Sequence, residues 1–299
     1  MVKYKYWELK IQLSKKDLEK LNDYMETFDL DGALGYYLTT FEEDNSEDPA
    51  FTVYYPIHHE NPQKELRTLF SKLKIENYKI SENPIEEENY WEDYIQSFQP
   101  FFVSQNFFLV PIWHKDSISI PENAIPIFIE PGLAFGTGLH PTTQLMLEWI
   151  DKNLQEGIVV LDAGCGSGIL SIASLKKNAK TVYAFDIDMN AIDATFMNIK
   201  HNDPSSELRN RTFLFTSSWD NDELLDKKYD VILANLSLPV FFRYESYIKR
   251  YQTNCLVISG IHENQTQEII DLFSNVYMPT QIQFREEWVL IELKKWQKI

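Results

Sequence analysis

Two apolar runs that each end in a carboxylate constrain the fold of this chain most. Residues 158–161 are apolar and are followed by Asp162, and residues 181–185 are followed by Asp186. Between them, glycines stand at positions 164, 166 and 168, and helix-forming residues come next. This order predicts a strand, a tight loop, a helix and a second strand, with an acidic side chain at the end of each strand.

The glycines indicate a loop that approaches a ligand closely, because glycine has no Cβ. Asp186 follows Gly164 by 22 residues, near the ~20 that separate a nucleotide-binding loop from its ribose-binding acid. Ile169 occupies the place of the third glycine of the dinucleotide fingerprint. Asp162 would also repel a pyrophosphate, so the loop favours a cationic or neutral nucleoside ligand. The alternative is a glycine-rich turn without function.

Strands and helices alternate from residue 158 onward. Predicted strands cover 158–163, 181–186, 212–215, 229–234 and 255–259, with helices at 169–178, 190–201, 240–251 and 263–273 and a closing antiparallel hairpin at 281–284 and 288–293. Such alternation predicts a doubly wound, mainly parallel α/β sheet with helices on both faces. Ligands of such sheets bind beyond the carboxyl ends of the strands, where Asp162, Asp186 and Asn235 fall.

The first third of the chain predicts a smaller domain of a different kind. Predicted strands cover 7–13, 35–39, 51–55 and 76–81, and predicted helices follow Ser14 and cover 61–73. The order strand, helix, strand, strand, helix, strand indicates a ferredoxin-like α+β domain. We expect three parts: this domain at 1–85, a connecting segment at 86–127 with a short helix at 86–98 and strands around 107–113, and the α/β domain at 128–299.

Composition restricts the partners and the compartment. The chain has 299 residues and a net charge of −17. Its first 100 residues hold 11 Lys or Arg against 21 Asp or Glu, which disfavours direct nucleic-acid binding. This acidity either steers a basic protein partner or only keeps the chain soluble. Only Cys165 and Cys255 occur, and no apolar run reaches the ~18 residues of a membrane span. We therefore expect a cytoplasmic protein without disulfides.

A second glycine-containing loop precedes the first strand of the α/β domain. Residues 130–143 contain glycines at 132, 136 and 138 and end in Pro141, Thr142 and Thr143. Proline followed by two threonines predicts a helix start with a hydroxyl cap. The N–H groups and hydroxyl there either bind a ligand carboxylate or only cap the helix.

The two loops together resemble one family. The run Phe135-Gly-Thr-Gly-Leu-His-Pro-Thr-Thr143 followed by Leu161-Asp-Ala-Gly-Cys-Gly-Ser-Gly168 is similar to the PrmA family, class I S-adenosylmethionine-dependent methyltransferases that modify the large-subunit ribosomal protein L-eleven (L11). The resemblance extends to Trp91, to residues 185–188 and to residues 256–261. It implies transfer of methyl groups from S-adenosylmethionine to lysine side-chain and N-terminal amines of L11, by a monomer whose first domain recognises the substrate.

The resemblance also implies a set of cofactor-binding residues. The six are Thr143, Asp162, Gly164, Gly166, Asp186 and Asn235. Asp186 would bind the ribose hydroxyls, and Gly164 would contact the cofactor closely. Thr143 would meet the cofactor from the adjoining loop, and Asp162 would accept a hydrogen bond from its amino group. Asn235 would border the reacting methyl group and the target amine.

Other candidates have plainer interpretations. We assign no general base, since His140 in its loop is more typical of a structural histidine. Cys165 is interpreted as a small filler of the loop, and Asp188 as a helix N-cap. His58 and His59 lack further ligands at metal-binding spacing, so we expect no metal site.

The sequence departs from the family at Leu139, where threonine is usual, and in the run from Asn235 to Pro239. The second departure leaves two alternatives open. One is a methyltransferase of another protein or of a small-molecule amine. The other is a non-catalytic cofactor-binding module that docks a ribosomal partner.

Overall fold

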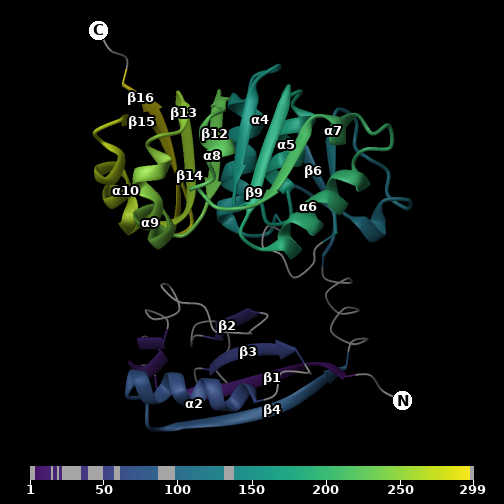
Figure 1. The fold of residues 1–299 in the computed structure, drawn as a ribbon. Helices are drawn as coiled ribbons and strands as arrows, with labels where there is room; N and C mark the ends of the chain where they lie inside the picture. The colour runs from purple at the N-terminus through teal and green to yellow at the C-terminus, as the bar shows by residue number, and fades with distance from the viewer. Residues whose placement is uncertain are drawn as a thin grey trace. The chain divides into compact units, whose positions relative to one another are not determined.

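A computed structural model describes residues 4–14, 16–18, 20–21, 35–39, 50–56, 61–86, 98–130 and 138–296. The chain divides into two compact units, Met1–Phe98 and Gln99–Ile299 (Figure 1). Each unit is described by itself.

The first unit is built on a four-stranded antiparallel sheet. Its strands are β1 (Tyr4–Leu13), β2 (Gly35–Thr39), β3 (Ala50–Pro56) and β4 (Tyr78–Glu86). The spatial order β2-β3-β1-β4, together with helix α2 (Pro62–Leu73) between β3 and β4, is that of a ferredoxin-like domain. Ser14 accepts a hydrogen bond from the Asp17 N–H at 3.2 Å, as expected of a residue that caps the predicted first helix.

Alternation along β1 places one side of that strand in the core. Leu9, Ile11 and Leu13 are buried together with residues of β3 and of α2. The helix begins after Asn61, whose side chain accepts from the Lys64 N–H at 3.1 Å, so the predicted start at 61 is confirmed. The period of two in β1 and the capped, amphipathic α2 are the local reasons for this packing.

The second unit contains a seven-stranded sheet of order β10-β9-β8-β12-β14-β16-β15. Its strands are β8 (Val159–Ala163), β9 (Thr181–Asp186), β10 (Thr212–Thr216), β12 (Val231–Asn235), β14 (Cys255–His262), β15 (Tyr277–Arg285) and β16 (Trp288–Lys295). The pairs from β10 to β14 are parallel, and β16 pairs antiparallel with both β14 and β15. The mainly parallel sheet and its closing hairpin are therefore confirmed.

Helices alternate with these strands. They are α4 (Pro141–Asn153), α5 (Ile169–Lys176), α6 (Met189–His201), α7 (Glu207–Asn210), α8 (Asp222–Leu225), α9 (Leu238–Ile248) and α10 (Thr266–Phe273), with a 3-10 turn at Glu263–Gln265. Strands β11 (Lys228–Tyr229) and β13 (Gln252–Thr253) form a separate two-stranded pair. Within the described ranges, no helix combines the length and apolarity that crossing a bilayer requires.

Helices cover both faces of the large sheet. Leu256 and Ile258 of β14 share one core cluster with Phe241 of α9 and Phe273 of α10. The residue between them, Val257, faces the other side of the sheet. Its antiparallel partner Glu292 accepts a hydrogen bond from Trp149 of α4 at 2.9 Å, so α4 lies on that other face.

A three-stranded sheet precedes α4 in the second unit. It consists of β5 (Phe101–Phe102), β6 (Phe107–Pro111) and β7 (Ile125–Ile129). The side chain of Asn202 accepts from the Phe128 N–H at 2.9 Å and that of Asn198 from the Glu130 N–H at 2.7 Å, which joins β7 to the end of α6.

The structure corrects some predicted elements between residues 86 and 129. The strand predicted to reach 113 ends at Pro111 and continues as a 3-10 turn, and β7 is absent from the prediction. Residues 87–97 of the predicted helix at 86–98 lie outside the described residues, and Glu86 ends a strand. The domain boundaries at 85 and 128 stay a prediction.

The strand order reverses direction at the centre of the large sheet. The chain proceeds from β8 outward to β9 and β10 and then returns to β12 on the opposite side of β8. Such a switch point is where ligands bind at the carboxyl ends of the strands in open α/β sheets. Asp162, Asp186 and Asn235 lie in the last two positions of β8, β9 and β12.

Candidate cofactor site

The loop after β8 adopts a conformation that demands glycine. Gly164, Gly166 and Gly168 have φ values of 72°, 53° and 79°, a region that side chains with Cβ rarely adopt. A Cβ on Gly164 would lie 2.5 Å from Cδ2 of Leu236. The Gly164 N–H donates to the carbonyl of Phe185 at 2.8 Å, so the loop is held against the end of β9.

Asp186 is held in place by backbone hydrogen bonds. Its Oδ2 accepts from the Gly166 N–H at 3.0 Å and its Oδ1 from the Asp188 N–H at 3.1 Å. The side chain is partly exposed. Because a carboxylate offers about four acceptor positions, these two bonds orient the group and leave acceptor positions for ligand hydroxyls.

Asp162 is a fully buried carboxylate with one unused oxygen. Its Oδ2 accepts from Ser171 Oγ at 2.6 Å, while its Oδ1 has no hydrogen-bond partner in the described part of the chain. Burial raises the pKa of Asp162 to about 6, and the nearby charge of Asp186 also raises it, although the bonds from Ser171 act in the opposite direction. A donor group that reached Oδ1 would stabilise the ionised form.

Three of the predicted site residues carry a buried polar atom of this kind. Thr143 Oγ1, Asp162 Oδ1 and Asn235 Oδ1 are each buried and have no partner among the residues that the structure describes. Asn235 lies two residues beyond Leu233, which pairs with Asp162 across adjacent strands. Buried polar atoms without partners are few in folded proteins and call for a specific explanation. A ligand that carries amino and hydroxyl groups fits this set of atoms.

The start of α4 differs from its prediction. His140, not a threonine hydroxyl, is the N-cap: its Nδ1 accepts from the Thr142 N–H at 3.3 Å and lies 2.8 Å from Thr142 Oγ1. Pro141 takes the first helical position, where its missing N–H costs nothing. The imidazole therefore caps the helix, and Thr143 lies in its first turn.

Two plainer interpretations are confirmed by the geometry. Asp188 caps α6 and accepts from the Asn190 N–H at 2.8 Å. Cys165 is 5% exposed, and burial raises its pKa far above the ordinary thiol range, so it fills the loop and is not a thiolate nucleophile. Among the described ranges no three metal-binding side chains are grouped, and His58 and His59 lie outside them.

Sequence reasoning missed three residues that shape this site. Ser171 holds Asp162, Leu236 packs on Gly164, and Gly260 has a φ of 86° with room for no Cβ, since one would lie 2.6 Å from the carbonyl oxygen of Leu236. Ser171 comes one helical turn after the glycine loop, which is a weak signal by itself. Leu236 follows β12, whereas Gly164 follows β8 and Gly260 lies within β14, so these contacts join distant segments and have no signature in sequence.

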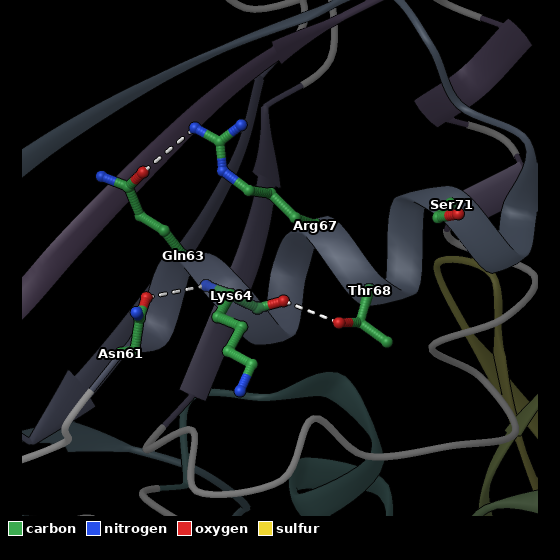
Figure 2. A pocket seen from close by; sticks show the side chains of 6 residues that line it. All are labelled: Asn61, Gln63, Lys64, Arg67, Thr68 and Ser71. Carbon is green, nitrogen blue, oxygen red and sulfur yellow. Dashed lines mark hydrogen bonds between the residues drawn. The ribbon is translucent and has the colours of Figure 1, made fainter.

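A separate polar pocket lies along α2 in the first unit. Figure 2 shows the side chains that line it: Asn61, Gln63, Lys64, Arg67, Thr68 and Ser71. Its hydrogen bonds include one from Arg67 to Gln63 at 3.3 Å within the helix and one from Gln63 to Glu82 of β4. It contains none of the predicted cofactor residues.

The doubly wound sheet, the glycine loop at its switch point and the acid that closes β9 are together those of a class I S-adenosylmethionine-dependent methyltransferase. The chain matches the PrmA family, described as ribosomal protein L11 methyltransferase, over residues 5–296. This chain belongs to that family.

Individual relatives match this chain over most of their own length. A ribosomal protein L11 methyltransferase of Leptospira interrogans is 28% identical over 97% of this chain and 99% of its own. One from Histophilus somni is 35% identical over 77% of this chain and 76% of its own. The crystal structure of a ribosomal protein L11 methylase from Lactobacillus delbrueckii subsp. bulgaricus has a TM-score of 0.58 and 27% identity, and the match covers 66% of this chain and 99% of that one.

Some residues that carry the resemblance lie outside the described part of the chain. These are Trp91 and residues 131–137 of the loop before α4. The six predicted cofactor residues are all described. The structure brings Asp162, Gly164, Gly166 and Asp186 together through the contacts given above, and the assignment of the set to a cofactor stays a prediction.

Proposed function

We propose that this protein transfers methyl groups from S-adenosylmethionine to lysine side-chain and N-terminal amines of ribosomal protein L11. One observation supports the proposal most: three predicted cofactor-site residues carry buried polar atoms without partners in the described part of the chain. They lie in the same unit as a glycine loop whose backbone has no room for side chains. Family membership supplies the substrate class.

Residues on three elements, β8, β9 and α4, would hold the cofactor. Asp186 would accept hydrogen bonds from the ribose hydroxyls, since two backbone N–H groups already orient its carboxylate. Asp162 Oδ1 would accept from the amino group, directly or through water. The Thr143 hydroxyl in the first turn of α4 suits the carboxylate, which a helix N-terminus also favours. When bound, the cofactor supplies a methyl group on a positively charged sulfur.

The chain's own contribution to the transfer is positioning. In-line displacement requires donor and nucleophile at about 3–3.5 Å with aligned orbitals. Asn235 Oδ1 is an acceptor at the end of β12, and it would accept an N–H of the target amine and orient the nitrogen lone pair. The amine must be neutral to react, and partial desolvation in the crevice lowers its pKa from the ordinary value of about 10.4.

The first unit would recognise the protein substrate. It has a complete ferredoxin-like sheet and its own core, and it contains none of the proposed cofactor residues. We further propose action on L11 as a monomer in the cytoplasm, without direct contact to nucleic acid.

Labelled S-adenosylmethionine and purified ribosomal proteins test this function. The expected result is label on the single band of L11, on lysine and N-terminal amines by mass spectrometry. Asn235→Ala should reduce the label while the affinity for the cofactor stays within a few-fold, because Asn235 acts on the target amine. Label on another protein would overturn the choice of substrate. Tight cofactor binding with label on no protein would favour the docking module.

A further inference from the structure

The end of the β15–β16 hairpin is a rigid structure beside the start of α4. Arg285 and Trp288 pair directly across the two strands, and only Glu286 and Glu287 connect them. Glu286 has a φ of 54°, the left-handed region that two-residue hairpin loops require. The carbonyl of Glu287 accepts from the Glu263 N–H at 2.8 Å, which holds the loop against the segment after β14.

Trp288 lies between two imidazole rings. The ring of His262 stacks on it with centroids 4.0 Å apart and an angle of 29°. The ring of His140 meets it edge-on, with centroids 4.7 Å apart and an angle of 69°. Aromatic pairs at such distances stabilise a fixed geometry beyond the area that they bury. Trp288 therefore packs directly against the His140 ring.

His140 in turn determines the first turn of α4. Its Nδ1 accepts from the Thr142 N–H at 3.3 Å and lies 2.8 Å from the Thr142 hydroxyl oxygen. The next residue, Thr143, carries the buried hydroxyl that has no partner among the residues that the structure describes. A shift of the His140 ring would move the N-cap and the threonine beside it.

Arg285 makes a second, independent connection to the same segment. Its guanidinium donates to Gln144 Oε1 and, at 2.6 Å, to Glu148 Oε1. Gln144 also donates from Nε2 to the carbonyl of Leu139 at 2.8 Å. Both strand ends of the hairpin thus contact residues 139–148, from the loop before α4 to its second turn.

We propose that Trp288 is a positioning residue that holds the 139–144 segment through His140 and so places Thr143 for the cofactor. The placement of the segment is a property of the ligand-free fold, whereas its consequence for the cofactor rests on the proposed function. Trp288 itself is assigned no contact with substrate or cofactor.

The charged surroundings of His140 give the proposal a pH-dependent readout. Burial lowers the pKa of His140 and the charge of His262 acts in the same direction, while Glu286 and Glu287 act in the opposite one. A protonated Nδ1 would donate and could no longer accept from Thr142. If Trp288 is replaced by a smaller side chain, water reaches the His140 ring and the effect of burial on its pKa weakens. The charges of Glu286 and Glu287 then outweigh it, so the pKa of His140 rises.

Trp288→Leu, Trp288→Phe and the control Trp296→Leu test the proposal. Trp296 is 55% exposed on the same unit and donates to the carbonyl of Ser274. Hydrogen exchange of the full-length, ligand-free chain should rise about tenfold for amides 142–145 in Trp288→Leu, at equal overall stability in urea, and stay within about twofold in the other two. Unchanged exchange in Trp288→Leu overturns the proposal.

Calorimetry with S-adenosylhomocysteine supplies the functional half. At pH 8 we expect Trp288→Leu to bind S-adenosylhomocysteine about tenfold more weakly than the parent. The pH below which the affinity falls should lie about one unit higher in this variant. Trp288→Phe should restore both the affinity and its pH dependence. Equal losses at every pH, or no rescue by phenylalanine, would leave only a structural role and overturn the proposal. If the unaltered chain binds no S-adenosylhomocysteine, the proposed function and the role of Trp288 toward the cofactor fail together, and the exchange result still decides the placement of the segment.

Discussion

Asp162→Asn is expected to stabilise the ligand-free protein above neutral pH and to weaken its binding of the cofactor. Asp162 is fully buried, and burial raises its pKa from 3.8 to about 6. Its Oδ2 accepts from Ser171, and an asparagine amide oxygen can accept the same bond. The substitution therefore keeps the shape and this hydrogen bond and removes the ionisation.

The size and sign follow from the two pKa values. A carboxyl whose pKa is higher in the folded state contributes stability that is present below pH 3.8 and is lost as the pH rises through about 6. The full loss is about 3 kcal/mol, and about half of it falls between pH 5 and pH 8. The variant escapes this loss, so its advantage over the parent should grow by that amount over this interval.

Urea unfolding of the ligand-free chain at several pH values measures this advantage, with tryptophan fluorescence to follow the second unit. Ser171→Ala is the matched control, because it removes the donor and leaves the carboxylate. We expect it to lower stability at every pH between 5 and 8. A difference between Asp162→Asn and the parent that is independent of pH would refute the reasoning.

The same variant should bind S-adenosylhomocysteine more weakly. The asparagine Nδ2 would replace the unpartnered Oδ1, and it would present a donor to the cofactor's amino group. Losing a charge-assisted bond of this kind costs about 1.5–3 kcal/mol, which is at least tenfold in Kd. Calorimetry that finds the parental Kd in the variant would remove Asp162 from the cofactor site.

Three further substitutions test the site and its support. Asp186→Ala should weaken cofactor binding by about 1.5–3 kcal/mol, and an unchanged calorimetric Kd would refute its assignment. Gly168→Ala should lower the free energy of unfolding in urea by about 1–3 kcal/mol, and by more than the control Gly157→Ala. Both glycines have φ above 70°, but only a Cβ on Gly168 would lie 2.7 Å from a threonine methyl. Equal losses in the two variants would contradict the steric argument. Burial would raise the pKa of Asp151, yet hydrogen bonds from Asn106 among others outweigh burial and lower the pKa. Asp151→Asn should therefore be less stable than the parent above pH 4 and approach the parent's stability as the pH falls. A difference in urea unfolding that does not depend on pH would contradict this.

Local pattern was sufficient for the elements that carry the site. The apolar runs that precede Asp162 and Asp186 each form a strand, as predicted. The carboxylate of Asp186 accepts a hydrogen bond from the Gly166 N–H. Asp188 caps α6 where its position before the helix indicated. These outcomes depend on residues within a few positions of one another, so strand length, turn chemistry and capping determine them.

Contacts between residues far apart in the sequence could not be predicted from local pattern. Pro141 and the threonines indicated a hydroxyl cap, but the ring of His140 caps α4 and packs against Trp288, which lies 148 residues further on. Tertiary packing overrode the local preference at this helix start.

The sequence by itself determined the fold class, the family and the identity of the residues at the strand ends, because the period of two, the glycines and the caps act over short distances. Only the tertiary structure decided that Thr143, Asp162 and Asn235 each carry a buried polar atom without a partner within the described ranges. It also decided that the tip of a distant hairpin adjoins the first turn of α4. Burial and pairing depend on what surrounds a side chain in three dimensions, and a linear pattern does not contain that information.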